Sequence, residues 1–133
     1  MDERDLAMID ALRRAHEAFN RGDLDAAAQL AHPEVEWVRT GGQASLRGAE
    51  ALRAWLEPDA FENQRVEPLD FRVQGNKVLV PQHAQARGTG SGINLDNENW
   101  TVWTFDDDLL VTRVESFLPH REAEALEAAG LSE

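Results

Sequence analysis

The sequence contains no cysteine, so it cannot form disulfides, thiolate metal sites or a cysteine nucleophile. Basic residues are also scarce: 13 Lys+Arg stand against 25 Asp+Glu, which gives a formal net charge of -12. Such a charge repels phosphate backbones and anionic membranes, so we expect neither nucleic acid nor a membrane as a partner. No apolar run is long enough to span a bilayer, and the first residues are charged where a signal peptide needs an apolar run. We therefore expect a cytoplasmic protein.

The length of 133 residues predicts a single domain over residues 1–133, large enough to bury a real core. Apolar residues recur at helical spacing near the start of the chain: Leu6, Ile9, Leu12 and Phe19. His16 stands where this stripe expects an apolar residue. Gly22 can adopt positive φ beyond the end of this helix, and Asp23 can cap a second helix from Asp23 to about Ala31.

The rest of the chain predicts strands with one further helix and a closing helix. A strand is expected over Val35–Arg39, a helix over Gly48–Leu56, and a final helix over Arg121–Ala129 ended by Gly130. Four segments rich in β-branched and aromatic residues are separated by turn signals: Val66–Val73, Lys77–Arg87, Leu95–Phe105 and Leu109–Leu118. Helices followed by a run of short-turned strands indicate an α+β fold with a mostly antiparallel sheet.

Three phrases carry a family resemblance: residues 18–25 (AFNRGDLD) at the helix corner, 32–37 (HPEVEW) entering the first strand, and 113–117 (RVESF) on the last strand. With the element order and the tail 124–131 (EALEAAGL), the chain resembles the SnoaL-like branch of the NTF2-like superfamily. That superfamily includes ketosteroid isomerase, limonene epoxide hydrolase and polyketide cyclases. The resemblance implies a cone: a strongly curved sheet wrapped around a long N-terminal helix, with a mostly apolar cavity.

Strand alternation then assigns residues to the cavity, if the cavity-facing positions of the family carry over. The inward set is Trp37, Arg39, His83, Gln85, Arg87, Thr101, Trp103, Phe105, Arg113, Glu115 and Phe117. An inward Glu115 beside apolar neighbours is a candidate for proton transfer, and the resemblance to limonene epoxide hydrolase, whose last strand carries a carboxylate, supports this. The alternative is a structural ion pair between Glu115 and an arginine.

Four other predicted site residues also have two interpretations. His83, with Gln85, is the second catalytic candidate, orienting a substrate or water, or else a histidine at the pocket rim. His16 either reaches the cavity floor or is a satisfied core residue. Trp37 and Trp103 stack on a flat ligand or are ordinary core.

The chain also departs from the enzymes it resembles. It has no tyrosine, Ala15 stands at about the position of the ketosteroid isomerase tyrosine, and Arg39 and Thr101 stand near its two aspartates. Steroid isomerisation by that mechanism is therefore not expected. His83 and Gln85 occupy about the places of the arginine and one aspartate of the epoxide hydrolase, so the Asp-Arg-Asp set is incomplete.

Two functions remain open: a small enzyme of isomerase, cyclase or hydrolase type acting through Glu115 and His83, or a module that binds a small molecule or only forms a dimer. The ligand-binding candidates are Trp37, Arg39, Gln85, Arg87, Thr101, Trp103, Arg113, Phe117 and His16. The arginines favour a small apolar molecule that carries a carbonyl or carboxylate. No cofactor and no metal are expected. Apolar residues on the outer face predict a homodimer: Trp100, Val102, Val114 and Leu118.

Overall fold

The structure is a computed structural model that describes residues 2–38, 45–48, 61–88 and 94–131. Two helices come first, α1 (Glu3–Asn20) and α2 (Leu24–Ala28). Three strands precede the long ones: β1 (Ala31–Val38), β2 (Ser45–Arg47) and β3 (Phe61–Pro68). The short β4 (Arg72–Gln74) leads to β5 (Lys77–Gly88), β6 (Asn94–Phe105) and β7 (Val111–Phe117), and α4 (Glu122–Ala129) closes the chain. The predicted helix Gly48–Leu56 lies almost wholly outside the described residues.

The caps of the helices follow from their sequences. The Asp2 carboxylate accepts from the backbone N–H of Asp5 at the start of α1, and that of Asp23 accepts from Ala26 at the start of α2. Both bonds satisfy donors that the first turn of a helix leaves without a partner. Gly22 and Gly130 have φ of 84° and 76°, the left-handed conformation in which a glycine ends a helix without a steric penalty. These predicted helix ends are confirmed.

One seven-stranded sheet forms the body of the domain, in the order β2-β1-β7-β6-β5-β3, with β4 also paired to β5. All strand pairs are antiparallel except β1 with β7. The α+β class and the mostly antiparallel sheet are therefore confirmed. None of the helices in the described residues is long and apolar enough to cross a membrane.

Two predicted boundaries were wrong. The helix expected to reach Ala31 ends at Ala28, and β1 already begins at Ala31 and runs through Pro33. A register irregularity between Ala31 and Glu36 accommodates the proline, which cannot donate to the ladder. The strand expected over Val66–Val73 is divided into β3 and β4.

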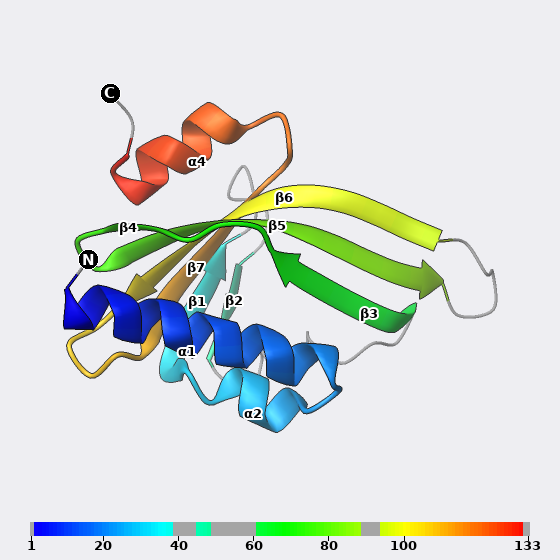
Figure 1. The fold of residues 1–133 in the computed structure, drawn as a ribbon, viewed down its shortest axis with the longest axis horizontal. Coiled ribbons are helices and arrows are strands. Elements are labelled where there is room, and N and C mark those ends of the chain that lie inside the picture. The colour runs from blue at the N-terminus through cyan, green and yellow to red at the C-terminus, as the bar shows by residue number, and fades with distance from the viewer. Residues whose placement is uncertain (1, 39–44, 49–60, 89–93, 132–133) are drawn as a thin grey trace.

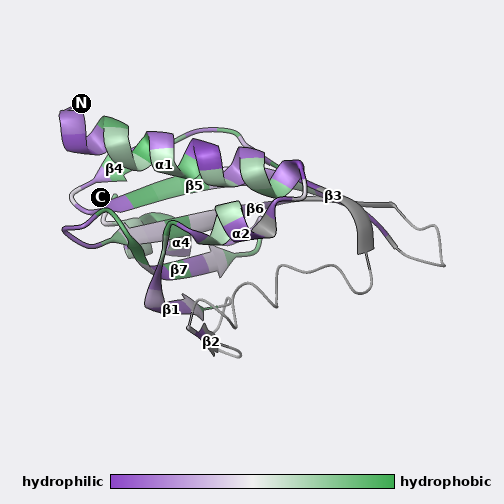
Figure 2. Cartoon of the chain, turned by 90° about the horizontal axis from the view of Figure 1, so that it is seen from below, coloured by the Kyte–Doolittle hydropathy of each residue, from purple (hydrophilic) through white to green (hydrophobic). Residues whose placement is uncertain are grey.

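Helices cover both faces of the sheet: α1 lies across one face and α4 across the other (Figure 1). Hydrophilic and hydrophobic residues alternate along α1, as expected of an amphipathic helix (Figure 2). On the α1 side the buried core joins the helix to β1, β5, β6 and β7: Met8, Leu12, Val35, Val78, Val80, Phe105, Val111 and Val114. On the α4 side a smaller core contains Leu79, Val102, Ala125 and Ala129.

Candidate functional site

The core against which a strand residue packs shows whether that residue faces α1 or α4. On β1 and β6 the prediction was correct: Trp37 and Trp103 pack against the α1-side core, and buried Thr101 shares their face. The indole N–H of Trp103 donates to the Thr101 hydroxyl (2.8 Å), which donates to the Val80 carbonyl oxygen (2.8 Å). The two tryptophan rings meet edge to face, with centroids 6.4 Å apart. Both therefore belong to the wall that faces α1.

On β5 and β7 the predicted faces were wrong. Val78 and Val80 pack toward α1, so His83, Gln85 and Arg87 point to the opposite face. On β7, Val114 packs toward α1, and this places Arg113, Glu115 and Phe117 on the α4 face, where Phe117 contacts the smaller core. The choice of which alternate residues face inward rested on the family resemblance. A shift of one residue along a strand moves every side chain to the other face of the sheet, and this is the error on β5 and β7. A register irregularity beside Phe105 further lets Val111 and Val114 share the α1 face.

Glu115 is consequently separated by the sheet from Trp37 and Trp103. Its carboxylate lies 3.3 Å from Arg113 Nη2, and Arg113 Nη1 lies 3.6 Å from Glu36 Oε1. The Arg113 side chain is about half exposed, at 47%. The structural ion pair, one of the two interpretations of Glu115, is thus present. A catalytic role stays a prediction that would require a ligand on the α4 face.

His83 also forms its contacts on the α4 face. Its Nε2 pairs with the carboxylate of Asp96, which accepts a second hydrogen bond from Gln85 Nε2 (3.5 Å). The hydrogen bond to Asp96 raises the pKa of His83, with smaller contributions from the negative charges of Asp96, Glu98 and Glu67. The same bond lowers the pKa of Asp96. His83 and Gln85 are therefore close together, as predicted, but far from the α1 side.

His16 is a predicted residue that the structure buries on the α1 side, at 7% exposure. Its Nδ1 lies 2.7 Å from the Leu12 carbonyl oxygen, so Nδ1 carries a hydrogen and donates. Its Nε2 lies 3.1 Å from Gln82 Oε1, and its ring meets Trp103 edge to face. Both ring nitrogens of His16 therefore contact protein atoms in this structure.

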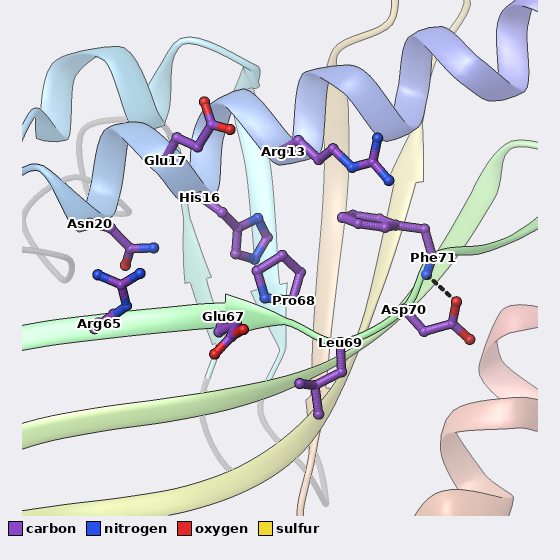
Figure 3. A pocket seen from close by; sticks show the side chains of 10 residues that line it. All are labelled: Arg13, His16, Glu17, Asn20, Arg65, Glu67, Pro68, Leu69, Asp70 and Phe71. Carbon is purple, nitrogen blue, oxygen red and sulfur yellow. Dashed lines mark hydrogen bonds between the residues drawn. The ribbon is translucent and has the colours of Figure 1, made fainter.

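A groove opens beside His16, between α1 and the end of β3 with the segment that follows it (Figure 3). We call it the α1/β3 groove; its volume is about 430 Å³. Its lining residues are Arg13, His16, Glu17, Asn20, Arg65, Glu67, Pro68, Leu69, Asp70 and Phe71. Asn20 ties the two walls together, because its side-chain amide donates to the Val66 carbonyl and accepts from the Val66 N–H, both at 2.8 Å. These two bonds hold the end of α1 against β3 on one side of the groove.

Sequence reasoning missed most of this site. Gln82 had a usable signal, since it follows Val78 and Val80 at two-residue spacing and interrupts an apolar face as His16 interrupts the helix stripe. Arg13 and Arg65 had none. Arg39, a predicted ligand contact, lies outside the described residues. The described residues contain no group of three or more His, Cys, Asp or Glu that could hold a metal ion.

Comparison with known proteins gives the family. Residues 12–113 match the model of the SnoaL-like domain, which is well over half of the chain. The chain belongs to the SnoaL-like domain family. No curated protein matches it.

Solved structures share this SnoaL-like fold at low sequence identity. An NTF2-like protein of unknown function from Burkholderia pseudomallei has a TM-score of 0.74 at 20% identity, covering 92% of this chain and 96% of that one. The epoxide hydrolase/cyclase-like enzyme SalBIII gives 0.77 at 16%, covering 88% and 93%. TerC, co-crystallised with polyporic acid, gives 0.72 at 23%, covering 90% and 98%. These likenesses establish the fold and leave the activity of this chain open.

Proposed function

We propose that this SnoaL-like domain binds a small, largely apolar organic molecule in the α1/β3 groove. The observation that carries the proposal is the groove itself, with the buried imidazole of His16 at its inner side and Pro68 and Phe71 on the opposite wall. Its volume of about 430 Å³ lies within the range of roughly 300–1,000 Å³ that is usual for small-molecule sites.

The polar groups behind the groove support a binding role. Burying an imidazole and an amide costs free energy unless both are hydrogen-bonded. Apolar side chains at these two positions would stabilise the fold without that cost. His16 and Gln82 instead form a buried polar pair beside Trp103. The groove itself combines the apolar side chains of Pro68, Leu69 and Phe71 with polar and charged ones, so it can both contact and orient a ligand. TerC, with the same fold, has been crystallised with polyporic acid.

A thermal-shift screen of small aromatic and aliphatic molecules tests the proposal, because a ligand that binds only the folded state raises the melting temperature. We expect hits whose effect is reduced in Phe71→Ala and in Leu69→Ala, which shorten groove side chains. Leu118→Ala is the matched control, since Leu69 and Leu118 are both 51% exposed and Leu118 is not among the groove residues. Hits that respond equally to Leu69→Ala and Leu118→Ala would contradict the proposal.

Acid-base catalysis is a second candidate, favoured by one observation. The partner of His16 Nε2 is the neutral side chain of Gln82, which a ligand hydroxyl can replace because a hydroxyl both donates and accepts. Incubating the screen hits with the protein and analysing products by mass spectrometry tests this. Turnover that is lost in His16→Gln while binding is retained would support catalysis. Turnover unchanged in that variant would exclude His16 as the catalytic group.

A further inference from the structure

Arg13 and Arg65 differ from the other arginines of this acidic chain. Among the residues whose side chains the structure describes, every other arginine has a partner. Six form ion pairs: Arg14, Arg21, Arg47, Arg72, Arg113 and Arg121. Arg4 donates to a carbonyl oxygen, and Arg87 also has a partner. Arg13 and Arg65 have neither an ion pair nor a hydrogen bond within the described part of the chain, and both line the α1/β3 groove.

The two arginines extend from opposite walls of the groove. Arg13, on α1, holds its guanidinium over the ring of Phe71, 5.1 Å from the ring centroid. Arg65, on β3, rises toward α1 and ends beside Asn20 (Figure 3). Asn20 cannot turn to meet it without giving up both bonds to Val66. Within the described residues the N–H donors of Arg65 are therefore uncommitted, while the guanidinium of Arg13 lies over the ring of Phe71.

Three carboxylates line the same groove, and none of them forms an ion pair with Arg13 or Arg65 within the described part of the chain. Asp70 is engaged by Arg72 Nε (3.1 Å) and by the backbone N–H of Phe71, and these two bonds lower its pKa. Glu67 is paired in register with His83 and contributes negative charge near that histidine. Glu17 points away from β3 (Figure 3). Carboxylates thus line the groove as well, but neither guanidinium group of the groove has an ion-pair partner among the described residues.

We propose that the α1/β3 groove selects small organic acids, with Arg65 binding the ligand carboxylate and Arg13 covering the apolar body of the ligand. This rests on the proposed binding function and names its ligand class. A guanidinium offers parallel N–H donors that match a carboxylate, and such charge-assisted bonds are the stronger ones in proteins. Pro68 and Phe71 supply the apolar contact. The carboxylate was also expected from the sequence, but through Arg39, Arg87 and Arg113 rather than these residues.

Calorimetric titration with 2-naphthoate and with the neutral 2-naphthamide tests the proposal. We expect 2-naphthoate to bind more tightly than 2-naphthamide, and Arg65→Gln to weaken the acid about tenfold or more, since hydrogen bonds to charged groups are strong. The amide should be unaffected by that variant. Arg13→Gln should weaken both compounds, because it removes the guanidinium that would lie over their naphthalene rings. The matched control is Arg14→Gln, the same charge change one residue along α1 at an exposed pair with Asp10.

Each outcome separates the two proposals. If neither compound binds the wild-type chain or any variant, while the thermal-shift screen finds neutral groove ligands, the acid preference is overturned and the binding function stands. If the screen also finds none, the binding function itself fails. Equal weakening of 2-naphthoate by Arg65→Gln and Arg14→Gln would reduce the effect to overall charge and overturn the role of Arg65. Circular dichroism melts of each variant exclude loss of folding as the cause.

Discussion

The buried pair of His16 and Gln82 makes the sharpest prediction for stability. The two residues are 7% and 9% exposed, and the bond between them is 3.1 Å long. Gln82→Met keeps the side-chain length but leaves His16 Nε2 without its partner, away from water. A buried polar group deprived of its partner costs about 1–3 kcal/mol, so we expect the free energy of unfolding to fall by that amount.

His16→Leu should destabilise by a similar amount, because it leaves the Gln82 amide unsatisfied and removes the bond to Leu12. The double variant His16→Leu/Gln82→Met leaves neither buried polar side chain without a hydrogen-bond partner. Its free energy of unfolding should therefore be higher, by about 1 kcal/mol or more, than the sum of the two single effects predicts. Urea unfolding of the four proteins measures this coupling. Additive effects, within about 0.5 kcal/mol, would refute the idea that the two side chains act as one buried pair.

Three further predictions concern the α4 side of the sheet. Asp96 raises the pKa of His83 above its ordinary value of 6.5. The protonated His83 therefore stabilises the fold fully below pH 6.5, and this contribution is lost as the pH rises through the raised pKa. The melting temperatures of wild type and His83→Gln should accordingly converge at high pH. Leu79→Ala, fully buried under α4, should cost about 2–5 kcal/mol in urea unfolding, and Leu118→Ala within about 0.5 kcal/mol. Gly130→Ala should lower the free energy of unfolding by about 1–2 kcal/mol, because an alanine at φ 76° is strained while its Cβ meets only an ordinary contact with Gln74. A thermal melt that matches wild type would contradict this.

Local chemistry made much of the fold predictable from the sequence. Asp23, Gly22 and Gly130 act through their own backbone, so the helix corner and the final cap could be placed without tertiary information. The strand faces were harder to predict. Alternation says which residues share a face, and only the packing of Val78, Val80 and Val114 on α1 says which face that is.

The same limit explains the candidate site. His16 was found because a polar residue in an apolar helix stripe is visible in the sequence. The pair of Arg13 and Arg65 lies far apart in the chain and becomes meaningful only when α1 and β3 are side by side. Their lack of carboxylate partners within the described residues is a property of the folded surface, and no sequence pattern carries it.

The structure also bears on the apolar surface from which the homodimer was predicted. Trp100 and Val102 lie on the outer face as expected, but Val114 faces α1. On that outer face α4 of the same chain already covers Val102, with Ala125 and Ala129. The apolar surface thought to require a second copy is therefore partly buried within one chain, and the dimer stays a prediction.

The measurement that tests the central claim most directly is NMR mapping of bound 2-naphthoate on the amide signals of the chain. The account predicts that the largest shifts fall on residues 13–20 of α1 and residues 65–71, on the two walls of the groove. Shifts centred instead on His83, Asp96 and Glu115, on the opposite face of the sheet, would contradict it.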